Sequence, residues 1–182
     1  MTAHKLSAHN PHKPLGPGEG ERVEHHVVIQ RTPAELYGLW QDLEVLSKVF
    51  VHVESVVQQV GGRSHWVVKG PLGARYELDV EIVSQVENEH IGWQSLPGGD
   101  IAAAGSVHFH PAGDGATELR VLLRYDALGG VVRSAIASIL GTDPAEEIAE
   151  DLERLKHRVE NGALPVREAA QIASKDSLRS TS

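Results

Sequence analysis

The sequence predicts an α+β fold: a curved seven-stranded antiparallel sheet, two short helices after the first strand, and a long C-terminal helix against the sheet. Three observations support this prediction. Apolar and polar residues alternate over seven segments, most of them separated by glycine-containing turns. Two capped helical patterns follow the first segment, and a long amphipathic pattern follows the last. Because the turns are short, consecutive strands should pair as a meander whose apolar face the long helix covers.

The folded domain is expected to span residues 23–162 of the 182-residue chain. Residues 1–22 are rich in proline and glycine and poor in apolar side chains, which predicts a disordered N-terminal tail. Residues 163–182 are polar and small, and we expect a flexible C-terminal tail there. The chain shows neither the apolar core of a secretory signal nor a membrane-length apolar run, so we expect a cytoplasmic protein.

The composition excludes several classes of function. A formal net charge of -8 disfavours binding to nucleic acid or to anionic membranes, whose partners usually carry basic surfaces. The chain has no cysteine, which rules out disulfides, thiolate catalysis and cysteine-ligated metals. No motif indicates a cofactor, and none indicates an oligomeric state.

The first strand is expected at 23–30, where β-branched residues are frequent. A helix should follow, with Thr32 as N-cap, Pro33 at the first helical position and Glu35 completing a capping box. The apolar pattern continues to residue 50 but is interrupted near Gln41–Asp42, so we expect two short helices. The six later strands are expected at 53–60, 63–69, 74–84, 88–96, 104–111 and 116–125.

The C-terminal pattern is helical and amphipathic. Asp143 is the expected N-cap of a segment that ends near Gly162, a residue suited to a helix C-terminus. A shorter apolar helical pattern precedes it, so the prediction is one long or once-kinked helix. The apolar stripe that should face the sheet consists of Ile148, Leu152, Leu155 and Val159.

Strand alternation assigns the side chains to two faces. The expected interior set is Trp66, Val68, Tyr76, Leu78, Val80, Ile82, Ile91, Trp93, Ser95, Val107, Phe109, Leu119, Val121, Leu123 and Tyr125. It contains no aspartate, glutamate, lysine or histidine, and its only hydroxyls belong to Tyr76, Ser95 and Tyr125. General acid–base catalysis needs a titratable group near the substrate, so we predict no catalytic residue.

The stretch GSVHFHP (105–111) contains a His-x-His motif, which can bind a metal because alternate strand residues point the same way. In the expected register His108 and His110 face solvent, opposite to Val107 and Phe109. A metal would need a third ligand, for which His65 is the available histidine. We therefore predict no metal site.

Several segments resemble one family in the expected order: VVIQRTPAELYGLWQDLEVLSKVFVHVESV (27–56), SHWVVKGPLG (64–73), HIGWQSLPGGDIAAAGSVHFHPAGDGATELRVLLRYDALGG (90–130) and LGTDPAEEIAEDLERLKHRVENG (140–162). They resemble bacterial polyketide cyclase/dehydrase-like proteins of the START-like, or SRPBCC, superfamily, in the branch near coenzyme Q-binding proteins. The resemblance implies a helix-grip fold with a hydrophobic cavity between sheet and C-terminal helix. Without it, the same aromatic side chains could simply fill a core.

The resemblance makes a carrier or sensor of a hydrophobic small molecule, such as a lipid, quinone or polyketide, the leading hypothesis. The alternative is a cyclase or dehydratase in which Tyr76 or Tyr125 polarises a substrate carbonyl; a protein-binding module is a third. The expected cavity residues are Tyr37, Trp40, Trp66, Val68, Tyr76, Leu78, Trp93, Ser95, Val107, Phe109, Leu123, Tyr125, Val132 and Ile136.

Overall fold

The computed structural model describes residues 15, 20–69, 73–125 and 144–164, and it confirms the α+β prediction. The strands are β1 (Glu21–Ile29), β2 (Val53–Gln58), β3 (Arg63–Lys69), β4 (Arg75–Val86), β5 (His90–Ser95), β6 (Ala103–Pro111) and β7 (Thr117–Tyr125), and the helices are α1 (Pro33–Gln41), α2 (Leu43–Val49) and α4 (Pro144–Glu160). All strand pairs are antiparallel, in the order β1-β7-β6-β5-β4-β3-β2. β1 begins two residues before the expected domain boundary. The helical pattern before residue 144 lies outside the described residues.

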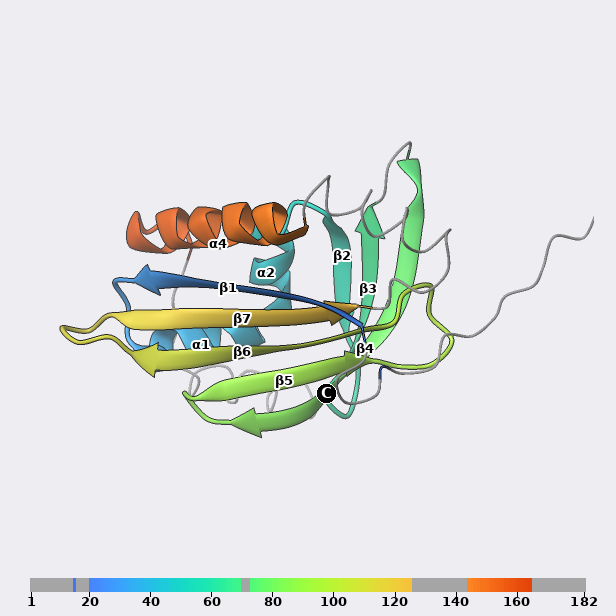
Figure 1. Ribbon diagram of the computed structural model, residues 1–182, viewed down its shortest axis with the longest axis horizontal. Coiled ribbons are helices and arrows are strands. Elements are labelled where there is room, and N and C mark those ends of the chain that lie inside the picture. The colour runs from blue at the N-terminus through green and yellow to red at the C-terminus, as the bar shows by residue number, and fades with distance from the viewer. Residues whose placement is uncertain (1–14, 16–19, 70–72, 126–143, 165–182) are drawn as a thin grey trace, which may run out of the picture.

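The sheet is strongly curved. β2, β3 and the first part of β4 run steeply across the direction shared by β5, β6, β7 and β1 (Figure 1). The β4–β5 register shifts between Ile82 and Ser84, which marks a bulge. Ile82 is 41% exposed there, so its assignment to the interior was wrong. Beyond the bulge the alternation is reversed, and Gln85 lies opposite Ile91.

Both short helices are defined by side-chain caps. The Glu35 amide donates to Thr32 Oγ1 at 3.3 Å and the Thr32 amide donates to Glu35 Oε2 at 2.8 Å, which confirms the capping box. The predicted break also occurs: Asp42 ends α1 and then caps α2, accepting from the Val45 amide at 3.1 Å.

The sheet face toward α1 is called the inner face below.

α4 lies beside β1 (Figure 1). Leu152, Leu155 and Val159 have no exposed surface, which confirms the predicted stripe. Each such burial contributes about 1.5–3 kcal/mol. Gly162 follows the helix with a φ of 71°, in the left-handed region that glycine adopts readily.

Polar contacts hold α4 to the elements around it. Arg158 donates to the Lys48 carbonyl at 2.9 Å, at the end of α2. The Gln30 amide donates to Glu160 Oε1 at 2.9 Å, next to the end of β1. α4 is therefore fixed both to the first strand and to the second helix.

Candidate functional site

The inner face of the sheet has a densely packed end beneath α1. Phe109 meets Tyr37 edge-on with ring centroids 5.7 Å apart, and Trp40 lies 6.4 Å from Phe109 and 5.9 Å from Phe50. Tyr37, Trp40 and Phe109 are all at least nine-tenths buried. At this end, protein side chains fill the space between helix and sheet, as the simple core interpretation predicts.

The other part of the inner face carries apolar side chains that are only half-buried. We call these residues the inner wall: Trp66, Val68, Tyr76, Trp93, Val121 and Leu123. They come from four strands, β3, β4, β5 and β7, and the antiparallel register puts them on one face. Half-burial leaves these groups with apolar surface that a ligand could cover.

Trp93 occupies the middle of this wall because the facing residue has no side chain. Gly105 is its register partner on β6. A Cβ atom at Gly105 would lie 2.3 Å from Cζ2 of Trp93, closer than side chains can approach. The indole therefore lies across the β6 backbone.

Four further predicted cavity residues, Leu78, Ser95, Val107 and Tyr125, are buried. Ser95 Oγ accepts a hydrogen bond from the Ala103 amide at 2.9 Å, so it also joins β5 to β6. Tyr125 donates its hydroxyl proton to Glu21 Oε2 at 3.1 Å. The last two predicted residues, Val132 and Ile136, lie outside the described residues.

The predicted interior set omitted two titratable side chains that share the inner face, the exposed Glu21 and the half-buried His25. Glu21 lies opposite Tyr125 in the register, and His25 lies opposite Val121. The alternation of buried Val23, Val27 and Ile29 in β1 could have identified both positions. The two are four residues apart on a strand, which separates them by about 13 Å, so His25 lies too far from Glu21 to share its contact with Tyr125.

A third polar inner residue, Gln85, was missed because the β4 bulge reverses the alternation before it. Its side-chain amide donates to the Tyr37 hydroxyl at 2.5 Å. This contact places one donor–acceptor pair at the border between the packed end and β4. A bulge leaves no clear local signal in sequence, so hydrophobic periodicity alone could not have found it.

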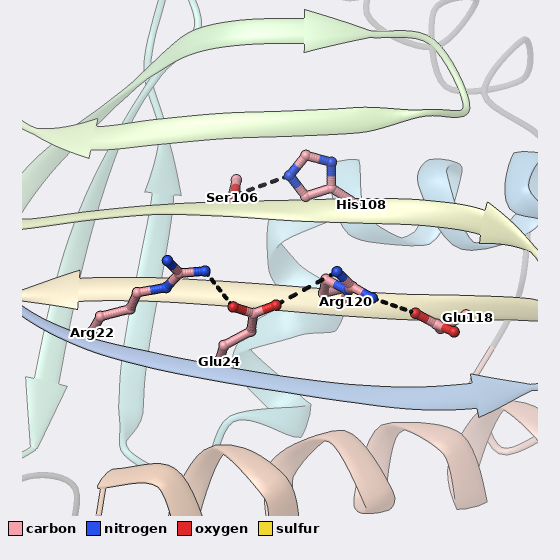
Figure 2. Close-up of polar contacts among 6 residues, drawn as sticks. All are labelled: Arg22, Glu24, Ser106, His108, Glu118 and Arg120. Atoms are coloured by element: carbon pink, nitrogen blue, oxygen red, sulfur yellow. Dashed lines mark hydrogen bonds and ion pairs between the residues drawn. The ribbon is translucent and has the colours of Figure 1, made fainter. Parts of the chain in front are cut away.

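The outer face of the sheet is polar and charged. Positive and negative side chains alternate across β1 and β7 in a series of ion pairs, here called the ion-pair series: Arg22, Glu24, Arg120 and Glu118 (Figure 2). His108 lies beside it on β6, with Nε2 3.2 Å from Ser106 Oγ. The predicted outward orientation of this histidine is confirmed.

The histidine next to this motif is not the expected one. His65 lies on β3, away from β6, with Nδ1 2.9 Å from Asp79 Oδ1. Its place as neighbour is taken by His90, which lies opposite His108 in the β5–β6 register. Within the described part of the chain, no three histidine or carboxylate side chains are arranged to hold a metal ion.

An antiparallel curved sheet with a C-terminal helix against its first strand is the architecture of helix-grip proteins. Residues 21–160 match the family described as polyketide cyclase/dehydrase and lipid transport. The chain belongs to that family, as its sequence resemblance predicted.

Relatives support this assignment. A crystal structure of a Deinococcus radiodurans protein is 31% identical, covers 78% of this chain and 99% of its own, and has a TM-score of 0.63. An uncharacterised 17.2 kDa Streptomyces lincolnensis protein is 29% identical over 139 residues, covering 76% of this chain and 89% of that protein. A START superfamily protein from Mycobacterium smegmatis, at 16% identity, shares the fold with a TM-score of 0.60, over 77% of this chain and 99% of its own. None of the described helices is long and apolar enough to cross a membrane.

Proposed function

We propose that this protein is a non-catalytic carrier or sensor that binds a hydrophobic small molecule, such as a lipid, quinone or polyketide, between the sheet and the C-terminal helix. The observation that carries the proposal is the inner wall, whose side chains are apolar but only half-buried. The family description, which includes lipid transport, agrees with a ligand of this kind. We expect the protein to act in the cytoplasm, on a free small molecule rather than on nucleic acid.

Apolar burial would supply most of the affinity. Covering the inner wall contributes about 25 cal/mol for each Å² removed from water, before the costs of ordering and association. Tyr125 and Glu21 form a hydrogen-bonded pair on the same face, and Tyr76 adds a second phenol. These groups could hold the polar end of a ligand and fix its direction.

The Tyr125–Glu21 pair is also the observation that favours the alternative, a cyclase or dehydratase. A phenol that donates to a carboxylate can pass on a proton if a substrate carbonyl takes the carboxylate's place. An unshifted phenol has a pKa near 10 and is a poor base at neutral pH. An enzyme of this type would lose turnover in both Tyr125→Phe and Glu21→Gln, while a carrier would show no turnover at all.

Native mass spectrometry of the full chain with panels of lipids, quinones and aromatic polyketides tests the leading proposal. We expect one bound molecule per chain and at least about tenfold weaker binding in Trp93→Leu, because the indole is the centre of the wall. Val57→Ala is the matched control, since Val57 is 58% exposed in β2, away from the inner wall. No binding across the panels, or unchanged affinity in Trp93→Leu, would contradict the proposal.

A further inference from the structure

Three imidazoles stack on the outer face of β5 and β6, opposite to the inner wall. We call His90, His108 and His110 the histidine trio. The rings of His90 and His108 have centroids 5.5 Å apart and are inclined by 23°. Those of His108 and His110 lie 5.9 Å apart and are nearly parallel, at 6°. The cross-strand pair and the i,i+2 pair thus form a continuous row of rings.

The histidine trio has no carboxylate partner. Elsewhere on the described chain, His52 lies 3.1 Å from a Glu147 oxygen and His65 lies 2.9 Å from an Asp79 oxygen. No carboxylate oxygen of the described residues comes within ion-pair distance, 4.0 Å, of any ring in the trio. Of the carboxylates in its neighbourhood, Glu24 and Glu118 are engaged by arginines in the ion-pair series (Figure 2), and Glu89 is exposed.

Charges from each adjacent strand act on the middle ring. The groups that flank His108 are His90 with the preceding Glu89 on the β5 side, His110 on β6, Arg120 and Glu118 on β7, and His26 and Glu24 on β1. Burial lowers the pKa of His108, and His90, His110 and Arg120 lower it further, whereas Glu24 opposes them. The pKa of His108, the middle ring, is therefore held below its ordinary value.

Acidification changes the charge balance of this surface in one direction. The ion-pair series has two arginines and two glutamates, so its charges cancel. Protonation of the trio adds up to three positive charges beside carboxylates, Glu24 and Glu118, that already pair with arginines. Imidazolium rings are also strong donors of charge-assisted hydrogen bonds. An external anion can both balance the added charge and accept these hydrogen bonds.

We propose that the histidine trio is a pH-gated binding site for a phosphate-type oxyanion, which it holds when its imidazoles are protonated. Two charge-assisted hydrogen bonds to one anion, each about 2.8 Å long, bridge nitrogens roughly 5–6 Å apart. The centroids of neighbouring rings in the trio lie 5.5 and 5.9 Å apart, which puts donors of two rings within reach of one anion. The site is independent of the proposed ligand on the inner face, because its side chains point to the opposite face of the sheet.

Ring-resolved NMR titration of the full chain tests this site. The histidine ring resonances are followed from about pH 8 to about pH 5 in sodium sulfate and in sodium chloride of equal ionic strength. Sulfate serves as the probe because its charge is constant over this range. We expect sulfate to raise the pH midpoint of His108 by about one unit, equivalent to about tenfold tighter binding to the protonated form.

Two variants separate the site from general screening. In the double variant His90→Gln/His110→Gln, the pH midpoint of His108 in sulfate should fall to its value in chloride. In His65→Gln, which removes an outer-face histidine that already has a carboxylate partner, the shift should persist. An equal sulfate shift at His52 and His108 in the wild-type protein would overturn the proposal, and this comparison needs no variant.

A second arm distinguishes the source of the anion. Sedimentation with vesicles of phosphatidylcholine containing phosphatidic acid is compared at about pH 5 and about pH 8. Trio-dependent binding to these vesicles without a sulfate shift supports a lipid phosphate as the anion, and a sulfate shift alone supports a free oxyanion. Absence of both effects would refute the site.

Discussion

Trp93 lies across Gly105, at a distance that leaves no room for a side chain on the β6 residue. The two are register partners, and a Cβ atom at Gly105 would also come within 2.8 Å of the Leu122 carbonyl oxygen. The glycine thus sets the position of one of the two tryptophan side chains in the inner wall. Its backbone conformation is ordinary, so the requirement for glycine here is one of space alone.

Gly105→Ala should displace the Trp93 indole and destabilise the fold by about 1–3 kcal/mol, the usual penalty of overpacking. Tryptophan fluorescence and near-ultraviolet circular dichroism report the displacement, and urea unfolding reports the stability. Ser106→Ala, a small change on the outer face of the same strand, is the control and should leave both spectra unchanged. Wild-type spectra and stability in Gly105→Ala would refute the close contact.

Tyr125→Phe should remove the hydrogen bond to Glu21 while keeping the buried ring. The expected loss is about 0.5–1.5 kcal/mol of unfolding free energy, measured in urea. Tyr76→Phe is the comparison variant, because that ring is only half-buried and belongs to the same face. A larger effect of the Tyr76 change would mean that the Tyr125–Glu21 contact contributes little in solution.

Thr32→Ala should destabilise the protein by about 0.5–2 kcal/mol, because the hydroxyl that it removes accepts from the Glu35 amide and donates to the Glu35 carboxylate. The readout is the urea midpoint. Ser47→Ala is a matched hydroxyl deletion on α2 and should change stability by less than about 0.5 kcal/mol. Equal effects of the two substitutions would contradict a special role for the cap.

Asp151→Asn should change the pH dependence of stability. Burial raises the pKa of Asp151 above its ordinary value, although Arg154 opposes the rise through charge and a hydrogen bond. The folded protein therefore binds this proton more tightly than the unfolded chain does. As pH rises from about 4 through the raised pKa, the wild-type protein loses stability from this group, and the loss is complete above that pKa.

The asparagine variant lacks this ionisation, so its unfolding free energy relative to wild type should increase between about pH 3 and about pH 7. Urea unfolding across this range measures the difference. Glu153→Gln, an exposed change on α4, serves as the control and should give a flatter curve. A relative stability of Asp151→Asn that falls with rising pH would show that the partnership with Arg154 outweighs burial.

Local signals in the sequence were sufficient for most of the fold. Thr32 and Asp42 cap their helices through contacts within three residues, so the helix starts could be read directly. Alternation placed Val107 and Phe109 inside and His108 outside. Alternation fails at Gln85, because the bulge after Ile82 adds a residue whose position depends on the neighbouring strand.

The candidate site was predictable only in part, for a related reason. The alternation of side chains along each strand predicts which aromatic residues point inward. Which of these residues are fully packed depends on where α1 lies. Tyr37 and Phe109 are therefore part of the packed end, whereas Trp93 and Tyr76 remain half-buried. The pairing of His90 with His108 likewise depends on the β5–β6 register across the connection at residues 96–102, which local sequence does not determine.

The strict alternation in β6 has a consequence for how this sequence can change during evolution. Gly105, Val107 and Phe109 face the inner wall and the packed end, while Ser106, His108 and His110 face outward. Deleting one residue at the start of this strand would exchange the two sets, placing imidazoles among the aromatic rings and phenylalanine in water. Substitutions can therefore alter either face separately, but length changes in β6 would damage both at once.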